Sequence, residues 1–151
     1  LFRSDLAVTR FSGRGAPAHP GGIPALPDAV TREAYSHEVI SAGFWPGGAG
    51  LDEAAFYAYA YAYPTPDALA AQRIVPEAAY WHAELREFIL PYARVRAAED
   101  PDAEQQRFLH SSFEAAAKLL DWPEDLIVAR TPSYGRPPVG HSSQSNPRGP
   151  M

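Results

Sequence analysis

The pattern of hydrophobic and polar residues begins with a period of two. Residues 5–12 (DLAVTRFS) place Leu6, Val8 and Arg10 on one face of an extended segment and the residues between them on the other. Alternation of this kind predicts a half-buried β-strand. Residues 13–28 are dense in glycine and proline, which break regular structure and favour turns, so a long surface loop is predicted to follow.

Two further strands are predicted, over residues 35–44 and 55–63. For the first of them a helix over residues 31–41 is the alternative, since helix-forming residues occur there. The Trp-Pro-Gly-Gly turn at residues 45–48 favours the strand. The other strand carries alanines on one face and four tyrosines on the other, Tyr57, Tyr59, Tyr61 and Tyr63.

The second half of the chain has apolar residues at helical spacing. Residues 76–95 carry them three and four positions apart, which predicts a long helix that Pro91 interrupts. A second long helix is predicted to begin at Asp100, a good N-cap residue followed by proline at the first helical position. Its apolar stripe is expected to bury Leu109, Phe113 and Leu120.

These elements predict an α+β fold. We expect a small, mostly antiparallel sheet of about three strands, followed by two long helices packed on one face. Residues 1–130 are expected to form a single domain. Residues 131–151 are rich in proline, glycine and serine and have little to bury, which predicts a disordered tail.

Composition excludes several classes of function. The net charge is −5 and Lys118 is the only lysine, so the chain has no basic surface for nucleic acid. There is no cysteine, which removes disulfides, thiolate nucleophiles and sulfur-ligated zinc. No apolar run approaches the roughly 20 residues of a membrane span, so no membrane contact is expected. We expect a cytoplasmic location.

Four ordered segments resemble one protein family. Residues 5–14 (DLAVTRFSGR), 32–47 (REAYSHEVISAGFWPG), 54–61 (AAFYAYAY) and 82–103 (HAELREFILPYARVRAAEDPDA) are similar to the C-terminal half of a bacterial family catalogued as domain of unknown function 5996. The resemblance implies an N-terminal half that would be a partner of this domain. It also implies that the isolated domain self-associates through an exposed surface. It implies no activity.

His37 and Glu38 are the candidates for catalysis. A histidine can transfer protons or bind a metal, and the adjacent carboxylate would be a second functional group. On a strand, however, neighbouring side chains point to opposite faces. In the alternative helix, Glu33 and His37 would share a face at metal-ligand spacing. A histidine hydrogen-bonded within the fold is the simpler interpretation.

The candidates for ligand binding are aromatic and basic. Trp45 and the tyrosine row offer surfaces for an aromatic ligand, a sugar or a protein partner, whereas the simpler interpretation is that alanines let a helix dock and tyrosines cover the other face. Arginines beside the glycine-proline loop offer a clamp for an anion. We therefore expect a ligand- or partner-binding module, with an enzyme as the alternative and no cofactor identified. The candidate residues are Arg10, Arg14, Trp45, Tyr57, Tyr59 and Tyr61.

Overall fold

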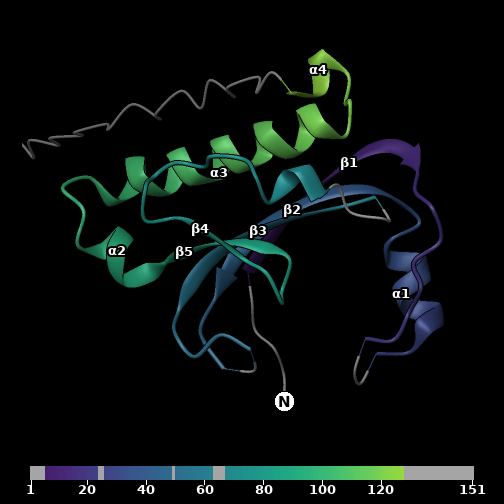
Figure 1. Cartoon of the computed structure of the whole chain (residues 1–151), viewed down its shortest axis with the longest axis horizontal. Helices are drawn as coiled ribbons and strands as arrows, with labels where there is room; N and C mark the ends of the chain where they lie inside the picture. Colours follow the sequence, from purple (N-terminus) through teal and green to yellow (C-terminus); the bar gives the residue numbers. More distant parts are fainter. Residues whose placement is uncertain (1–5, 24–25, 49, 63–66, 128–151) are drawn as a thin grey trace, which may run out of the picture.

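One antiparallel sheet organises the domain. The computed structural model describes residues 6–23, 26–48, 50–62 and 67–127. In these ranges five strands pair in the order β1-β2-β3-β5-β4 (Figure 1). The strands are β1 (Leu6–Gly15), β2 (His37–Trp45), β3 (Ala55–Tyr61), β4 (Tyr80–His82) and β5 (Glu87–Pro91).

The longest helix, α3 (Pro101–Leu119), lies across one face of this sheet (Figure 1). The short helix α1 (Asp28–Ala34) lies away from α3, at one end of the strands (Figure 1). As predicted, the Asp100 side chain caps the long helix, accepting a hydrogen bond of 3.0 Å from the Ala103 amide. Within the described residues, no helix has both the length and the apolarity that a membrane crossing requires. The helices are α1 (Asp28–Ala34), the 3-10 turn η1 (Asp67–Leu69), α2 (Tyr92–Arg96), α3 (Pro101–Leu119) and α4 (Glu124–Ile127).

The α+β class agrees with the sequence, but the expected three strands and two long helices are wrong. The predicted helix over residues 76–95 is instead the β4–β5 hairpin followed by the short α2. Phe88 and Leu90 join the core under α3 while Ile89 packs on the opposite face. A strand buried on both faces has a continuous apolar run, which periodicity cannot distinguish from a buried helix. Arg86, with a φ of 57°, makes the tight turn between the two strands.

The second strand begins later in the structure than was predicted. Residues 28–34 form α1, and β2 begins only at His37, so helix and strand divide the ambiguous segment between them. The predicted tail, residues 131–151, and Tyr63 lie outside the described ranges.

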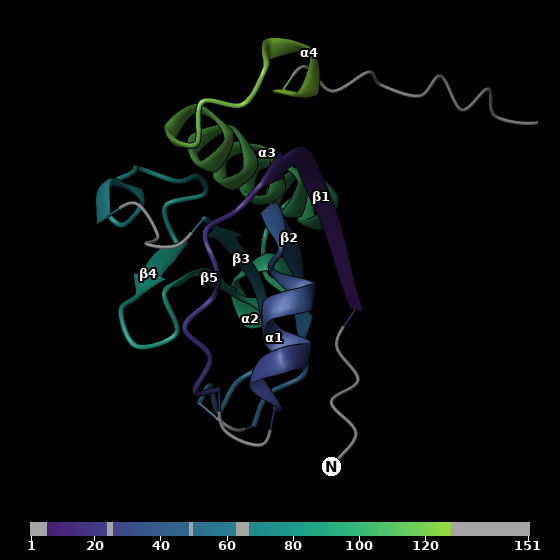
Figure 2. The ribbon, with the colours of Figure 1, turned by 90° about the vertical axis from the view of Figure 1, so that its right-hand side faces the viewer.

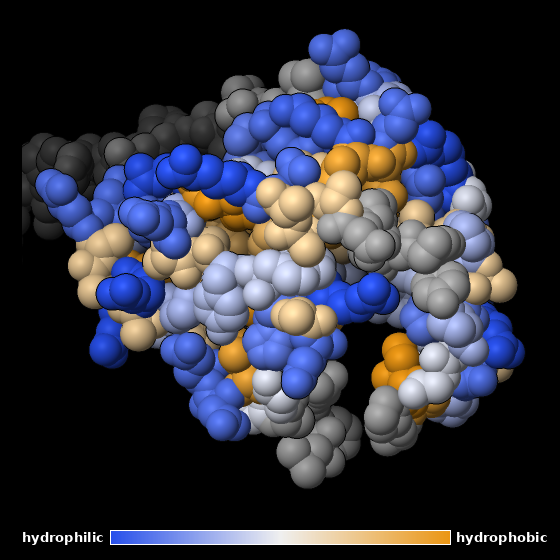
Figure 3. Space-filling view, viewed as in Figure 1, coloured by the Kyte–Doolittle hydropathy of each residue, from blue (hydrophilic) through white to orange (hydrophobic). Residues whose placement is uncertain are grey.

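The main core lies between α3 and the sheet. Ala58 and Ala60 on β3 and Ala116 and Ala117 on α3 all belong to it, and small side chains on both surfaces let the helix approach closely. Phe108 fills the centre, with none of its surface exposed. The outer surface of α3 is hydrophilic, and apolar residues lie below it where the helix meets the sheet (Figure 3).

The two edges of the sheet differ (Figure 2). Strand β4 is an edge of three residues, whereas β1 is an edge of ten residues. Nine of the ten β1 residues are exposed, so this strand is paired on one side and otherwise open to solvent. Long open edges of this kind recruit other chains.

Candidate functional site

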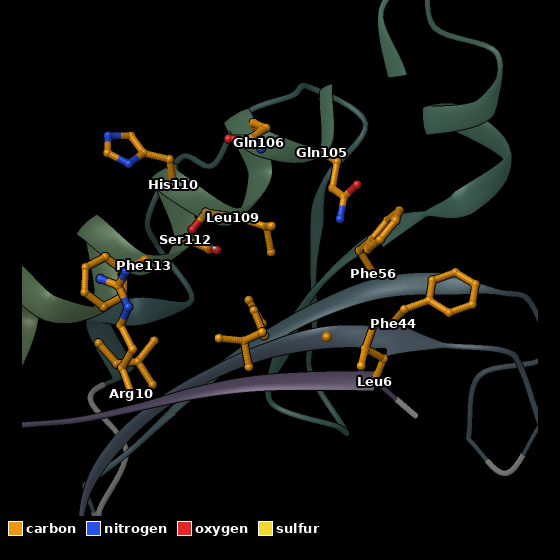
Figure 4. A pocket seen from close by; sticks show the side chains of 15 residues that line it. Leu6, Arg10, Phe44, Phe56, Gln105, Gln106, Leu109, His110, Ser112 and Phe113 are labelled. Atoms are coloured by element: carbon orange, nitrogen blue, oxygen red, sulfur yellow. Dashed lines mark hydrogen bonds between the residues drawn. The ribbon is translucent and has the colours of Figure 1, made fainter. Parts of the chain in front are cut away.

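A groove opens between β1, β2 and α3, and we call it the β1–α3 groove (Figure 4). The two strands and part of β3 form its floor, and one flank of α3 forms its wall. Its volume is about 340 Å³. The groove is lined by Leu6, Val8, Arg10, Ile40, Ala42, Gly43, Phe44, Phe56, Ala58, Gln105, Gln106, Leu109, His110, Ser112 and Phe113.

The groove leaves apolar side chains in water. Leu6 and Val8 are 76% and 69% exposed, although they point to the same side of the sheet as the buried Ile40. Apolar surface gains roughly 25 cal/mol per Å² when it is removed from water. An apolar ligand seated on these residues would therefore be bound with a favourable free energy.

The width of the sheet explains why the groove is open. Five strands about 4.8 Å apart make a sheet roughly 19 Å wide between its outer strands, whereas a helix with its side chains is about 10 Å across. The long helix α3 contacts β2 and β3. Residues 67–79 and α2 contribute Leu69, Ile74 and Val95 to the core on the β5 side. No described element covers β1 in the same way.

One end of the groove carries a positive charge. The guanidinium carbon of Arg10 lies 4.6 Å from the centroid of the Phe113 ring, a cation–π contact between β1 and α3. The Phe113 ring in turn meets Trp122 edge-on, with centroids 6.0 Å apart. These aromatic contacts hold Arg10 at this end of the groove.

The other strand arginine, Arg14, has a different environment. Its Nε donates to Glu38 Oε2 at 3.0 Å, and its Nη2 donates to the carbonyl oxygen of Leu120. Glu38 Oε2 also accepts from Ser12 Oγ at 2.8 Å. This network joins β1 and β2 to the C-terminal end of α3, so Arg14 and Glu38 stabilise the packing of the helix on the sheet.

The two catalytic candidates do not meet. Glu38 is held in the network just described, whereas His37 is exposed, with its Nδ1 3.1 Å from Ser36 Oγ. As neighbours on β2 they point to opposite faces of the sheet. Among the described residues no group of three histidine, aspartate or glutamate side chains is placed to hold a metal. His37 and Glu38 therefore do not form one site within the described residues.

The tyrosine row lies on the face of the sheet away from α3. Tyr57 and Tyr61 are buried, and Tyr59 is partly buried. The Tyr57 ring crosses Gly43 on β2, where an added Cβ would lie 2.8 Å from the ring. Trp45 packs on the same face, and its Nε1 donates to the Gly48 carbonyl oxygen at 3.3 Å. These aromatic side chains cover the sheet.

The glycine-proline loop joins this aromatic face through a histidine. His19 lies between the rings of Tyr35 and Tyr61, with centroids 5.2 Å and 5.1 Å away, and its Nδ1 accepts from the Gly21 amide at 2.9 Å. The Tyr35 and Tyr59 hydroxyls are 3.4 Å apart. Burial, followed by the contact with Tyr59, raises the pKa of Tyr35 above its usual value. The cluster holds the loop against the sheet.

Of the six residues expected to bind ligand, only Arg10 lines the β1–α3 groove. The tyrosines and Trp45 lie on the opposite face, and Arg14 is engaged with Glu38. The α3 wall was not predicted as a binding surface. Leu109 and Phe113, which lie four residues apart on this wall, were interpreted as part of a core stripe.

Comparisons with known proteins give one match. No curated protein and no solved structure matches the chain. One family of unknown function, DUF5996, matches residues 2–129, which is most of the chain. The four segments that suggested this family lie within the matched range. The chain therefore belongs to the family of unknown function DUF5996.

Proposed function

We propose that the domain is a ligand-binding module that holds a small apolar molecule in the β1–α3 groove. The groove volume of about 340 Å³ lies at the lower end of the range of roughly 300–1,000 Å³ that small-molecule sites occupy. Its wall and floor are mainly aliphatic and aromatic, with a few polar groups at the rim. Such a lining binds by burying apolar surface and orients the ligand through its few polar contacts.

The observation that carries this proposal is the exposure of Leu6 and Val8 beside a buried floor. Their side chains lie on the floor of a concave surface and do not stand as isolated residues on a convex one. Isolated exposed hydrophobic residues are ordinary, whereas contiguous apolar patches mark binding sites.

Binding of 1-decanol tests the proposal, measured by titration calorimetry on the wild-type chain. The variant Val8→Gln keeps an exposed strand residue but removes its apolar branch from the groove. We expect its affinity to fall about tenfold, since losing a buried aliphatic group costs roughly 1.4 kcal/mol.

The matched control is Phe11→Gln. Phe11 lies on the same strand and is 55% exposed, but it points to the opposite face of the sheet. We expect this variant to bind decanol as the wild type does. Absence of decanol binding to the wild type, or equal losses in both variants, would contradict a site in the groove.

A second candidate function, partner binding, is favoured by the open edge of β1. The strand contains no lysine, proline or acidic residue of the kind that protects natural edges from pairing. The partner strand would come from a second copy of the chain. Addition of a strand to a sheet edge is a common mode of recognition.

Sedimentation of the chain over a range of concentrations tests this second function. The variant Ala7→Lys places a charge on the β1 edge at a residue that does not line the groove, and we expect it to shift the chain to monomer. Ala83→Lys, at an exposed position between β4 and β5, is the control. A wild-type chain that stays monomeric, or a dimer that survives Ala7→Lys, would contradict pairing through β1.

A further inference from the structure

The two ends of the β1–α3 groove differ in chemistry (Figure 4). Arg10 and Phe113 lie at one end, and Leu6, Phe44 and Gln105 lie at the other. Between them the floor is aliphatic. A ligand that matches this groove has a charged head at one end and an apolar body.

The Arg10 guanidinium is held in place but makes no ion pair or hydrogen bond with any residue in the described ranges. Arg14, four residues along the same strand, is bound to Glu38 and to the Leu120 carbonyl oxygen. The two arginines thus differ in their partners. Arg14 is satisfied within the fold, whereas no described residue takes a hydrogen bond from the Arg10 guanidinium.

Two other polar residues of the lining are engaged within α3. Ser112 Oγ donates to the Phe108 carbonyl oxygen at 2.8 Å, and His110 Nε2 is 3.1 Å from Glu114 Oε1. Glu114, the acidic residue next to Phe113, also contacts Lys118. Within the groove, therefore, the charge at the Arg10 end is not neutralised by a neighbouring carboxylate.

We propose that the ligand of this groove is a medium-chain carboxylate whose head group binds Arg10. A guanidinium presents parallel N–H donors that match the two oxygens of a carboxylate, and stacking on an aromatic ring keeps this fork oriented. This inference rests on the proposed function, since it specifies the ligand of the same groove.

The length of the groove sets the length of the ligand. Four residue steps separate Arg10 from Leu6, which corresponds to roughly 13 Å along a strand. With carbon–carbon bonds of about 1.5 Å in an extended zigzag, a chain of about ten carbons has a similar length. The apolar body would lie over Val8 and Ile40 and reach the aromatic residues at the far end.

Three ligands of equal chain length test the head group: decanoate, 1-decanol and decylamine, each titrated at pH 7.5 by calorimetry. We expect the wild type to bind decanoate about tenfold more tightly than decanol, since a hydrogen bond to a charged group gains more than a neutral one. Decylamine should bind more weakly than decanol because its charge repels Arg10. The preference for decanoate should decrease with added salt, since Arg10 is solvent-exposed.

The variant Arg10→Met keeps much of the apolar stem and removes the guanidinium. We expect it to lose the roughly tenfold preference for decanoate and to bind decanol unchanged. The control Arg94→Met removes an exposed arginine of α2 that does not line the groove, and it should leave all three affinities as they are.

The outcomes separate the two proposals. If the wild type and Arg10→Met both bind decanol and decanoate with equal affinity, the groove binds apolar molecules but the carboxylate proposal is overturned. A parallel loss of decanol and decanoate affinity in Arg10→Met would also overturn it, because the stem and not the charge would then be responsible. If none of the three ligands binds the wild type, the proposed function itself is overturned.

Discussion

The two flanks of α3 rest on the same sheet but end in different surroundings. On the β5 flank, Phe88 and Leu90 are buried beneath Leu69 and Val95, which residues 67–79 and α2 supply. On the β1 flank, Leu6 and Val8 have similar side chains and remain exposed. Apolar character alone does not decide which residues form a core.

Cover decides it. A single helix spans about two strands of a five-stranded sheet, so the sheet needs a second element on each side of α3. The chain provides one on the β5 side through its irregular segment after β3. Among the described residues the β1 side has no such cover, and for this reason we propose a binding site there.

The largest effect is expected from Phe108→Ala. Phe108 is fully buried in the core under α3. Removing its ring leaves a cavity, which should lower the free energy of unfolding by about 3–5 kcal/mol. Chemical denaturation of the variant and the wild type measures the difference. A loss below about 1 kcal/mol, typical of surface positions, would mean that the core under α3 is not closed around Phe108.

A second substitution breaks the floor of the groove and leaves the core flank intact. In Gly43→Ala the new Cβ would lie 2.3 Å from the Leu6 carbonyl oxygen and 2.7 Å from the Tyr57 hydroxyl. Overpacking of this kind should cost about 2 kcal/mol and push β1 away from β2.

The control for this substitution is Gly15→Ala. Gly15 lies in β1, the strand paired with β2, and an added Cβ there would meet no atom within 4 Å. We expect its midpoint of denaturation to stay at the wild-type value. Equal destabilisation by the two substitutions would show that the close approach at Gly43 is not the cause.

A smaller effect is expected from Phe113→Ala. Phe113 is only partly buried and lines the groove under Arg10. Because part of the ring is already in water, the cost should be about 1–2 kcal/mol, below that of Phe108→Ala. The same variant should lose affinity for decanol in the calorimetric titration. A cost equal to that of Phe108→Ala would show that the two flanks are equally closed.

This pair of phenylalanines shows how far the sequence could predict the fold. The helix and its N-cap at Asp100 follow from local spacing and are confirmed. The stripe was expected to bury Leu109, Phe113 and Leu120. Of these only Leu120 is buried, and the other two are partly buried. Phe108 is the central residue instead, because the rotation of a helix on a sheet depends on what covers each flank.

The β4–β5 hairpin could not be predicted by the same reasoning. Its residues include good helix formers such as Ala83, Glu84 and Leu85, and their local preference is outweighed by pairing with β3. Long-range pairing of this kind has no signature in a window of a dozen residues. The predicted sheet therefore lacked two of the five strands, β4 and β5.

The candidate site was predicted in part. Arg10 was chosen because it lies beside the glycine-proline loop. It lines the groove for a different reason, which is that its position on β1 faces Phe113 of α3. His37 and Glu38 were chosen for their chemistry. Convergence of residues from β1, β2 and α3 depends on strand order, which the sequence pattern does not contain.

The smallest effect is expected at the open end of the groove, from Leu6→Ala. Leu6 is 76% exposed, whereas Leu90 on the closed flank has none of its surface exposed. The same substitution should therefore cost within about 0.5 kcal/mol at Leu6 and about 2–5 kcal/mol at Leu90. The effect of Leu6→Ala should appear only when ligand is bound, because decanoate stabilises the folded state by an amount that increases with its affinity. At a fixed decanoate concentration, the wild type should gain more in melting temperature than Leu6→Ala, although the two start within a degree or two of each other. A large loss of stability at Leu6 without ligand would mean that β1 is already covered in solution, and the difference between the two flanks of α3 would disappear.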